Sequence, residues 1–225
     1  LIPRNVTSLD RLGIMCFNER LERVDAEEGH TAFRSDADGV LFDITGTRIV
    51  YFPKAKTGEY VVPDRVTHLG AAAFQSATRL TNLTFPPSLI SIEEWAFADC
   101  ASLTNVIIPS SVSFLGGAAF CGCQNLEQVS ISEGVREIGA AAFGDGPRLE
   151  SISVHLDDPA FVALDGVLYD KACLALIQYP GGRVGTYHIP SGVTTIRTGA
   201  FHGASQLKEL EMPESVKDIE TQVFY

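Results

Sequence analysis

Hydrophobic residues recur along this chain with a fixed period. Seven phenylalanines mark it, at Phe17, Phe74, Phe97, Phe120, Phe143, Phe201 and Phe224. The successive gaps are 57, 23, 23, 23, 58 and 23 residues. Self-similarity at a period of about 20–50 residues is typical of solenoids and other repeat architectures. The spacing therefore predicts a stack of similar coils, interrupted twice.

Each unit repeats the same internal pattern around its phenylalanine. In the unit of Phe120, the aliphatic residues Val112 and Leu115 precede the ring, and Val129 and Ile131 follow it in alternation with polar residues. Alternation of this kind predicts a half-buried strand after the phenylalanine. Proline cannot donate to a ladder, so it ends such strands. It does so at Pro86, Pro109 and Pro213. The segment between the aliphatic pair and the phenylalanine is predicted to be a turn or a short helix.

A unit of 23 residues cannot bury its apolar side alone, whereas stacked coils can, with like positions lying over like. The phenylalanines would then form a continuous spine with rings about 5 Å apart, which is the spacing of neighbouring strands. We therefore expect one solenoid domain over residues 1–225.

The two long gaps match each other and predict two insertions, at about residues 31–56 and 158–183. Residues 38–43 (DGVLFD) align with residues 165–170 (DGVLYD). Each insertion is expected to form two or three short strands with turns at Asp-Gly and Thr-Gly pairs. The insertions add candidate exposed aromatic residues, but most of these are expected to fill a small core of the insertion: Phe42, Tyr51, Phe52, Tyr169 and Tyr179.

The unit resembles the leucine-rich repeats of the Treponema pallidum type, which are also called BspA-like. The resemblance is carried by residues 103–109 (LTNVIIP), then Val112, Leu115, Gly116, Ala119, Phe120 and Cys123. It implies a leucine-rich-repeat solenoid with a parallel β-sheet on its concave side, short helical or irregular convex segments, and two inserted β-hairpin-like modules. It also implies a bacterial surface or secreted protein that adheres to host matrix proteins or to other cells.

Charge and composition exclude several kinds of partner. The net charge is -11 and the pI is near 4.8, so a phosphate-binding surface for nucleic acid or anionic membrane is not expected. No apolar run approaches the ~20 residues of a membrane helix. Neither end looks like a polar capping repeat, since residues 1–3 resemble the end of a strand and residues 224–225 fall within a unit. This favours a piece of a larger protein, or ends covered by a partner.

Candidate chemistry is sparse. Cys121 and Cys123 have no second cysteine or histidine cluster at the spacing of a zinc site, so Cys100 and Cys123 are interpreted as small buried residues one coil apart. A disulfide between those two is the alternative. The five histidines lack a familiar catalytic spacing, and Asp157 and Asp158 are interpreted as a turn that opens an insertion. We expect no metal, no cofactor and no enzymatic activity.

The outward side chains of the predicted strands form the candidate ligand-binding surface. They are small, neutral, and rich in amides and hydroxyls in the middle of the stack, with charged residues at both ends. The tentative set is Asn82, Thr84, Asn105, Ile107, Gln128, Ser130, Ser151, Ser153 and His188. We expect a protein or glycan ligand, and host extracellular matrix is one candidate source of it. The alternative is a structural role, in which the open solenoid ends dock another copy or the rest of a larger protein.

Overall fold

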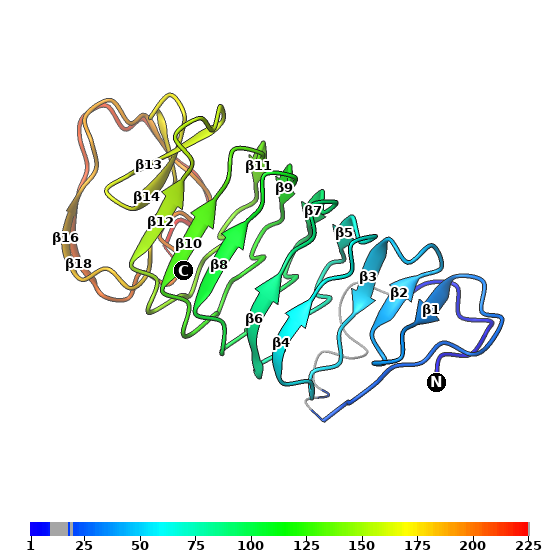
Figure 1. Ribbon diagram of the computed structural model, residues 1–225. Coiled ribbons are helices and arrows are strands. Elements are labelled where there is room, and N and C mark those ends of the chain that lie inside the picture. The colour runs from blue at the N-terminus through cyan, green and yellow to red at the C-terminus, as the bar shows by residue number, and fades with distance from the viewer. Residues whose placement is uncertain (10–17, 19, 225) are drawn as a thin grey trace.

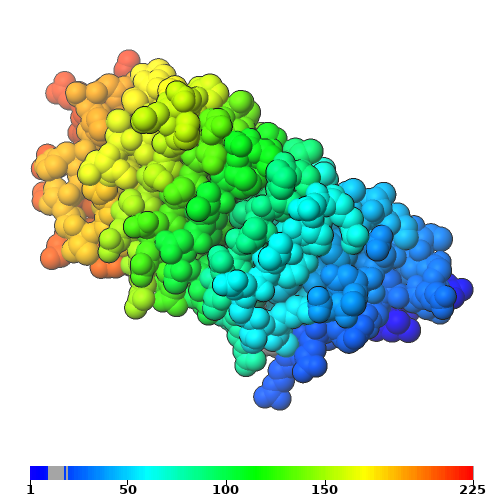
Figure 2. Space-filling model, viewed as in Figure 1, coloured from blue at the N-terminus to red at the C-terminus, as the bar shows by residue number. Residues whose placement is uncertain are grey.

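The computed structural model describes residues 1–9, 18 and 20–224, and within these residues the chain winds as a solenoid (Figure 1). The coils contribute strands of four or five residues to a front ladder and strands of mostly two residues to a back ladder. Strands of successive coils run parallel within each ladder. In Figure 2 the colours follow one another in bands along the long axis, so each stretch of chain occupies its own segment of the molecule. The predicted solenoid of stacked coils is confirmed.

The front ladder consists of the strands predicted from the alternating pattern. They are β4 (Gly58–Val61), β6 (Leu80–Thr84), β8 (Asn105–Ile108), β10 (Gln128–Ile131), β12 (Ser151–Val154), β16 (Gly185–His188) and β18 (Leu207–Glu211). They fall into three separate sheets, β4-β6, β8-β10-β12 and β16-β18. After β10 and β12, the N–H groups of Ser132 and His155 donate to Ile108 and Ile131 of the preceding coil. Pro109 stands at the corresponding position after β8 and has no N–H to donate, which contributes to the break beside β6.

The back ladder is built mainly from two-residue strands around the aliphatic pair. Its members are β3 (Arg48–Tyr51), β5 (His68–Leu69), β7 (Ser91–Ile92), β9 (Phe114–Leu115), β11 (Glu137–Ile138), β15 (Ala175–Gln178), β17 (Thr195–Ile196) and β19 (Asp218–Ile219). The convex segments are thus short strands and turns, and the described residues contain no helix. The residue two before the phenylalanine has a positive φ in each regular coil, as at Ala72 (56°), Ala118 (52°) and Ala141 (51°). A left-handed residue at this point stops a right-handed helix from forming.

Each insertion folds as a three-stranded antiparallel meander that joins the back ladder. The first comprises β1 (Phe33–Ser35), β2 (Leu41–Asp43) and β3, and the second comprises β13 (Phe161–Leu164), β14 (Val167–Asp170) and β15. The third strand of each pairs in parallel with the next coil, β3 with β5 and β15 with β17. The second meander also interrupts the back ladder, because β11 ends one sheet and β15 belongs to the next.

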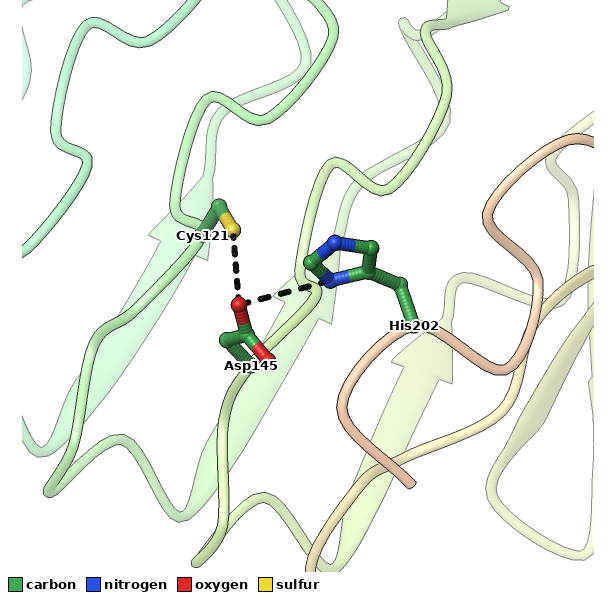
Figure 3. Close-up of side chains that lie close together, drawn as sticks. All are labelled: Cys121, Asp145 and His202. Atoms are coloured by element: carbon green, nitrogen blue, oxygen red, sulfur yellow. Dashed lines mark hydrogen bonds and ion pairs between the residues drawn. The ribbon is translucent and has the colours of Figure 1, made fainter. Parts of the chain in front are cut away.

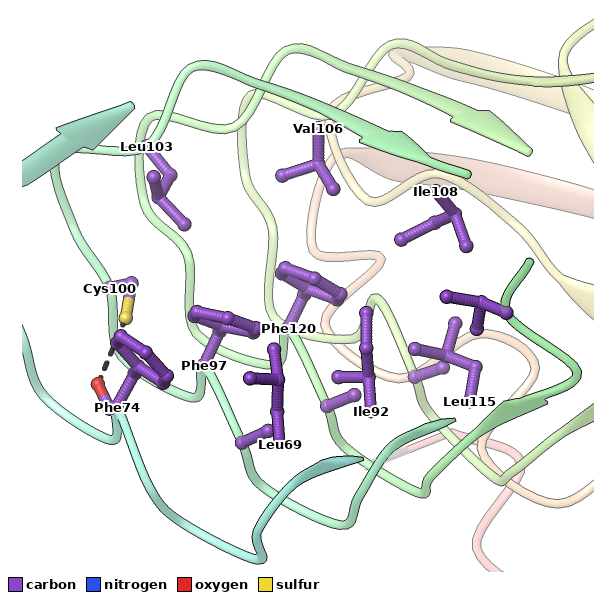
Figure 4. Packing of buried hydrophobic residues seen from close by; sticks show 14 of the residues in the cluster. Leu69, Phe74, Ile92, Phe97, Cys100, Leu103, Val106, Ile108, Leu115 and Phe120 are labelled. Atoms are coloured by element: carbon purple, nitrogen blue, oxygen red, sulfur yellow. Dashed lines mark hydrogen bonds between the residues drawn. The ribbon is translucent and has the colours of Figure 1, made fainter. Parts of the chain in front are cut away.

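The aromatic spine is present and falls into two runs. Ring centroids lie 4.6, 4.7, 5.0 and 5.8 Å apart along Phe52, Phe74, Phe97, Phe120 and Phe143. They lie 5.1 and 5.3 Å apart along Tyr179, Phe201 and Phe224. Figure 4 shows Phe74, Phe97 and Phe120 of the first run between inward residues of the front coil segments and of the back ladder. Phe17 lies outside the described residues.

The interpretation that the aromatic residues of the insertions fill a core is supported, and none of the five candidates is exposed. Phe42, Tyr51, Phe52, Tyr169 and Tyr179 are all buried. Phe52 and Tyr179 stack on the next ring of the spine, and Tyr169 places its hydroxyl against that of Tyr187. The insertions therefore extend the solenoid core, because burying an aromatic ring removes a large apolar area from water.

Candidate functional site

The outward side chains of β8, β10 and β12, here called the front face, form two rows that are in register. Asn105, Gln128 and Ser151 are direct neighbours across the three strands. Ile107, Ser130 and Ser153 are neighbours in the second row. All six are exposed or half-buried, while the residues between them point into the core. Because parallel strands lie about 4.8 Å apart, the rows present groups at the spacing of a ladder.

The front face combines neutral polar groups with one large apolar side chain. Ser153 Oγ lies 3.0 Å from Ser130 Oγ, and Asn105 Nδ2 donates to Thr104 Oγ1 at 3.3 Å. Ile107 stands beside these groups with 68% of its surface exposed. A surface of amides, hydroxyls and one aliphatic side chain can accept and donate hydrogen bonds without a net charge. It offers groups for binding rather than for acid–base chemistry.

The nine residues of the predicted surface are distributed over three separate sheets. Asn82 and Thr84 are exposed on β6, but they pair with Glu59 and Val61 of β4 in a separate sheet. His188 lies on β16 in a third sheet, where its Nδ1 is 2.8 Å from Glu211 Oε2. Backbone pairing is interrupted between β6 and β8, so Asn82 is not a ladder neighbour of Asn105.

Asp157 and Asp158 lie at the start of the second insertion, where the sequence predicts a turn, and Asp158 has a structural role there. Asp158 is fully buried, and its Oδ1 accepts the N–H groups of Ala160 at 2.8 Å and Phe161 at 2.7 Å. His30 does the same at the first insertion, where its Nδ1 accepts from Ala32 and Phe33. Both side chains cap the first strand of a meander.

The interpretation of the stacked cysteines as buried residues is also supported. Cys100 and Cys123 are buried and free, and each thiol donates to the carbonyl of a phenylalanine one coil earlier, Phe74 at 3.2 Å and Phe97 at 3.3 Å. The alternative disulfide between them is not formed. Cys16 lies outside the described residues.

A cluster that the spacing argument missed lies where the second insertion separates the two runs of the spine. Cys121, Asp145 and His202, here called the junction cluster, come from three different coils (Figure 3). Cys121 Sγ is 3.8 Å and His202 Nδ1 is 3.5 Å from Asp145 Oδ2. Burial, followed by the carboxylates of Asp145 and Asp99, raises the pKa of the Cys121 thiol to about 12. Burial and the charge of Asp145 also raise the pKa of Asp99.

The junction cluster could have been found by aligning the coils on their phenylalanines. Cys121 and His202 each follow a spine phenylalanine directly, and Asp145 stands two residues after another. A search for local motifs misses them because Cys121 and His202 are 81 positions apart. The long insertion hides the fact that the coils of Phe143 and Phe201 are in contact, as the hydrogen bond from Asp145 N to His202 O shows (3.2 Å).

A cavity of about 550 Å³ adjoins the junction cluster. Cys121 and His202 line it together with Trp95, which is 45% exposed and is the single tryptophan of the chain. A second cavity of about 440 Å³ lies beside β11 and β15, and both are lined by Glu137 and Thr198. The interruption of the back ladder thus produces a recessed surface next to three potential metal ligands.

Comparison with known proteins identifies the repeat. The profile of the "BspA type Leucine rich repeat region" matches residues 49–158 and 182–225, which is more than half of the chain. No curated protein matches this chain. Within the described residues we find no helix that could cross a bilayer.

Two solved structures share the fold. One is a leucine-rich repeat protein from Eubacterium ventriosum, with 23% identity over 84% of this chain and a TM-score of 0.65. The other is the pneumococcal vaccine antigen PcpA, with 22% identity over 87% of this chain and a TM-score of 0.53. The chain spans 60% and 52% of the lengths of those two proteins.

Proposed function

Because this chain belongs to the BspA-type leucine-rich repeat family, we propose that it is a non-enzymatic binding module of a bacterial surface or secreted protein. The proposed ligand is an extended polypeptide that lies across β8, β10 and β12. The observation that carries the proposal is the double row of exposed side chains held in register on these strands. Repeat proteins commonly bind partners along such extended surfaces.

The chemistry of the front face favours a polypeptide. Asn105, Gln128 and the serines supply donors and acceptors for a peptide backbone, and Ile107 supplies an apolar contact for a side chain. Carbohydrate usually stacks on aromatic rings, and none of the six side chains of the front face is aromatic. A glycan ligand is therefore the competing outcome of the test.

The finer part of the proposal is adhesion at a bacterial surface, with host extracellular matrix proteins as the first class of partner to examine. Two observations support it. The family resemblance implies such a role, and one protein of similar fold is a vaccine antigen. The absence of any charged side chain among the six residues of the front face agrees with a binding role and not with catalysis.

The test is a binding screen with a matched pair of variants. Wild-type protein is presented to displayed unstructured peptides, to matrix proteins and to a glycan array. The double variant Asn105→Arg/Gln128→Arg should lose the peptide or matrix-protein binding found for wild type. The control Thr78→Arg/Thr221→Arg, which adds the same charge at exposed positions outside the front strands, should bind as wild type. Retention of full binding by the first variant, or binding of glycans alone, would refute the proposal.

A structural role is the second candidate, and it rests on the exposed apolar surface of the last coil. Phe224 is 55% exposed although it stacks on Phe201, and Ile219 of β19 is 50% exposed. A second copy or another segment of a larger protein could cover these side chains. Light scattering tests it: a concentration-dependent dimer that Phe224→Ser abolishes would favour assembly over ligand binding.

A further inference from the structure

We propose that Cys121, Asp145 and His202 bind a zinc ion, which ties the two runs of the solenoid together. Thiolate, imidazole and carboxylate are the ligands that Zn²⁺ takes from proteins. The three ligand atoms lie within 4.8 Å of one another and come from the coils of Phe120, Phe143 and Phe201. The site is independent of the front face.

Two of the three separations between ligand atoms are close to those around a tetrahedral ion. Zinc bonds of about 2.0–2.3 Å at tetrahedral angles place neighbouring ligand atoms about 3.3–3.6 Å apart. The two measured separations from Asp145 Oδ2 are 3.5 Å to His202 Nδ1 and 3.8 Å to Cys121 Sγ. These separations are long for hydrogen bonds, yet they are within a few tenths of an ångström of the edges of a zinc tetrahedron. The ligand atoms of Cys121 and His202 lie within 4.8 Å of each other, so side-chain rotation would have to set their separation to the length of a tetrahedral edge.

The backbone around the cluster accommodates each ligand. Asp145 adopts a positive φ of 49°, which aspartate tolerates better than most residues, and its N–H is bonded to the carbonyl of His202. Gly144 leaves room for the imidazole, because a Cβ at this position would lie 2.7 Å from His202 Nδ1. Cys121 is 7% exposed, and the His202 side chain is 18% exposed. The site is thus partly shielded from water and is formed by contacts between coils.

The local charge favours a cation. The carboxylates of Asp145 and Asp99 both act on Cys121 with their negative charge, which a bound cation would offset. On binding, the thiol would release its proton to solvent, and the sulfur would donate the freed electron pair to zinc. The thiolate and Asp145 would then balance the two positive charges of the ion.

Three protein ligands leave one coordination position open. Because Cys121 and His202 line the 550 Å³ cavity, the fourth ligand would be a water molecule or a group of a partner that enters this cavity. Trp95 lines the same cavity, so its fluorescence is expected to report a quenching ion such as Co²⁺ bound at the cluster.

The experiment titrates chelator-treated, reduced protein with Zn²⁺ by calorimetry and with Co²⁺ by absorption. We expect one equivalent of either ion, a thiolate-to-cobalt band in the near ultraviolet, and a higher Tm with zinc because the ion binds the folded state. Cys121→Ser, Asp145→Asn and His202→Gln should each weaken binding at least tenfold. Loss of a residue that only supports a ligand typically costs about 10–100-fold in metal affinity, and loss of the ligand itself should cost no less. Gly144→Ala should also weaken it, by displacing the imidazole.

Matched controls separate the cluster from other thiols and imidazoles. Cys173→Ser and His155→Ala change the same residue types outside the cluster and should bind zinc as wild type does. Asp145 is exposed, so Asp145→Asn should fold even if Cys121→Ser does not. The unfolding midpoint of each variant, measured in the presence of chelator, shows whether it is folded. The absence of binding at micromolar zinc, or unchanged affinity in Asp145→Asn and His202→Gln, would overturn the proposal.

Discussion

At the scale of the residue, the spine shows how one ring is held by its neighbours. Phe120 is buried between Phe97 and Phe143, at centroid distances of 5.0 and 5.8 Å and interplanar angles of 10° and 16°. Stacked aromatic pairs contribute about 0.5–1.5 kcal/mol beyond the burial of their area. A ring in the middle of the run takes part in two such pairs, so its loss should be felt in both adjacent coils.

Phe120→Ala should therefore lower the free energy of unfolding by about 3–5 kcal/mol, because it leaves a cavity in the spine. Glu127→Ala removes an exposed side chain just before β10 and should change the free energy of unfolding by less than about 0.5 kcal/mol. Denaturant unfolding monitored by circular dichroism measures both. Equal losses for the two variants would contradict the stacked arrangement.

Cysteine reactivity is a second property of single residues. Burial is the largest cause that raises the pKa of Cys100 well above its usual range and the pKa of Cys123 to about 12. The thiolate is the reactive form, so both should resist a thiol reagent in the native protein at neutral pH. In a Cys16→Ser background, Cys173, which is half-buried, should react first, and Cys100 and Cys123 only after denaturation. Rapid native labelling of the last two would show that this column of the coil is not interior.

At the scale of the element, the meanders depend on a buried cap at their first strand. Asp158 accepts two backbone N–H groups, and its substitution by Ala would leave both unpaired in a buried position. Each unpaired buried donor costs about 1–3 kcal/mol, so the loss of both partners in Asp158→Ala should destabilise the protein by about 2–6 kcal/mol.

The neighbouring carboxylate provides the control for this cap. The side chain of Asp157 is 88% exposed, so Asp157→Ala should change stability by less than about 0.5 kcal/mol. Asp158→Asn should lose less stability than Asp158→Ala, because the amide oxygen Oδ1 of asparagine can still accept both N–H groups. Chemical unfolding ranks the three variants. If Asp157→Ala were the most destabilising, the assignment of the cap to Asp158 would be wrong.

Some elements are predictable from the sequence pattern and others are not. The strands β8, β10 and β12 each carry the alternating pattern and were predictable, as were the two matching insertions. The back ladder was predicted as turns or short helices because two residues cannot display a period. Phe52 and Tyr179 were not recognised as members of the spine, since they precede the next ring by 22 residues instead of 23.

The candidate sites also differ in how far the sequence predicts their residues. The outward direction of Asn105, Gln128 and Ser151 follows from alternation alone, so their placement could be predicted. The break between β6 and β8 could not, because it depends on contacts between coils. Alignment of the coils places Cys121 and His202 at the same position of their units, but a search for local motifs misses the junction cluster because the insertion separates these residues in the sequence.

At the scale of the whole molecule, the solenoid separates its charged and neutral surfaces along one axis. The six side chains of the front face carry no formal charge, while β18 presents Glu209 and Glu211 outward near the far end. A ligand on the front face would therefore be held by neutral hydrogen bonds and an apolar contact. Neutral contacts are not screened by salt, whereas exposed charge pairs are. The salt dependence of binding thus reports where along the axis a ligand lies.

For a peptide or matrix protein recovered with wild-type protein, we expect a Kd near the micromolar range that changes little between about 0.05 and 0.5 M salt. Immobilising many copies on a bead should raise the apparent affinity by about a hundredfold or more, because later contacts become intramolecular. Surface plasmon resonance at both salt concentrations, with the protein either captured sparsely or presented densely, measures both effects. Glu209→Gln/Glu211→Gln, which neutralises the charged strand, should bind as wild type. Binding that weakens tenfold at high salt and is altered in this variant would place the ligand on β18, outside the front face.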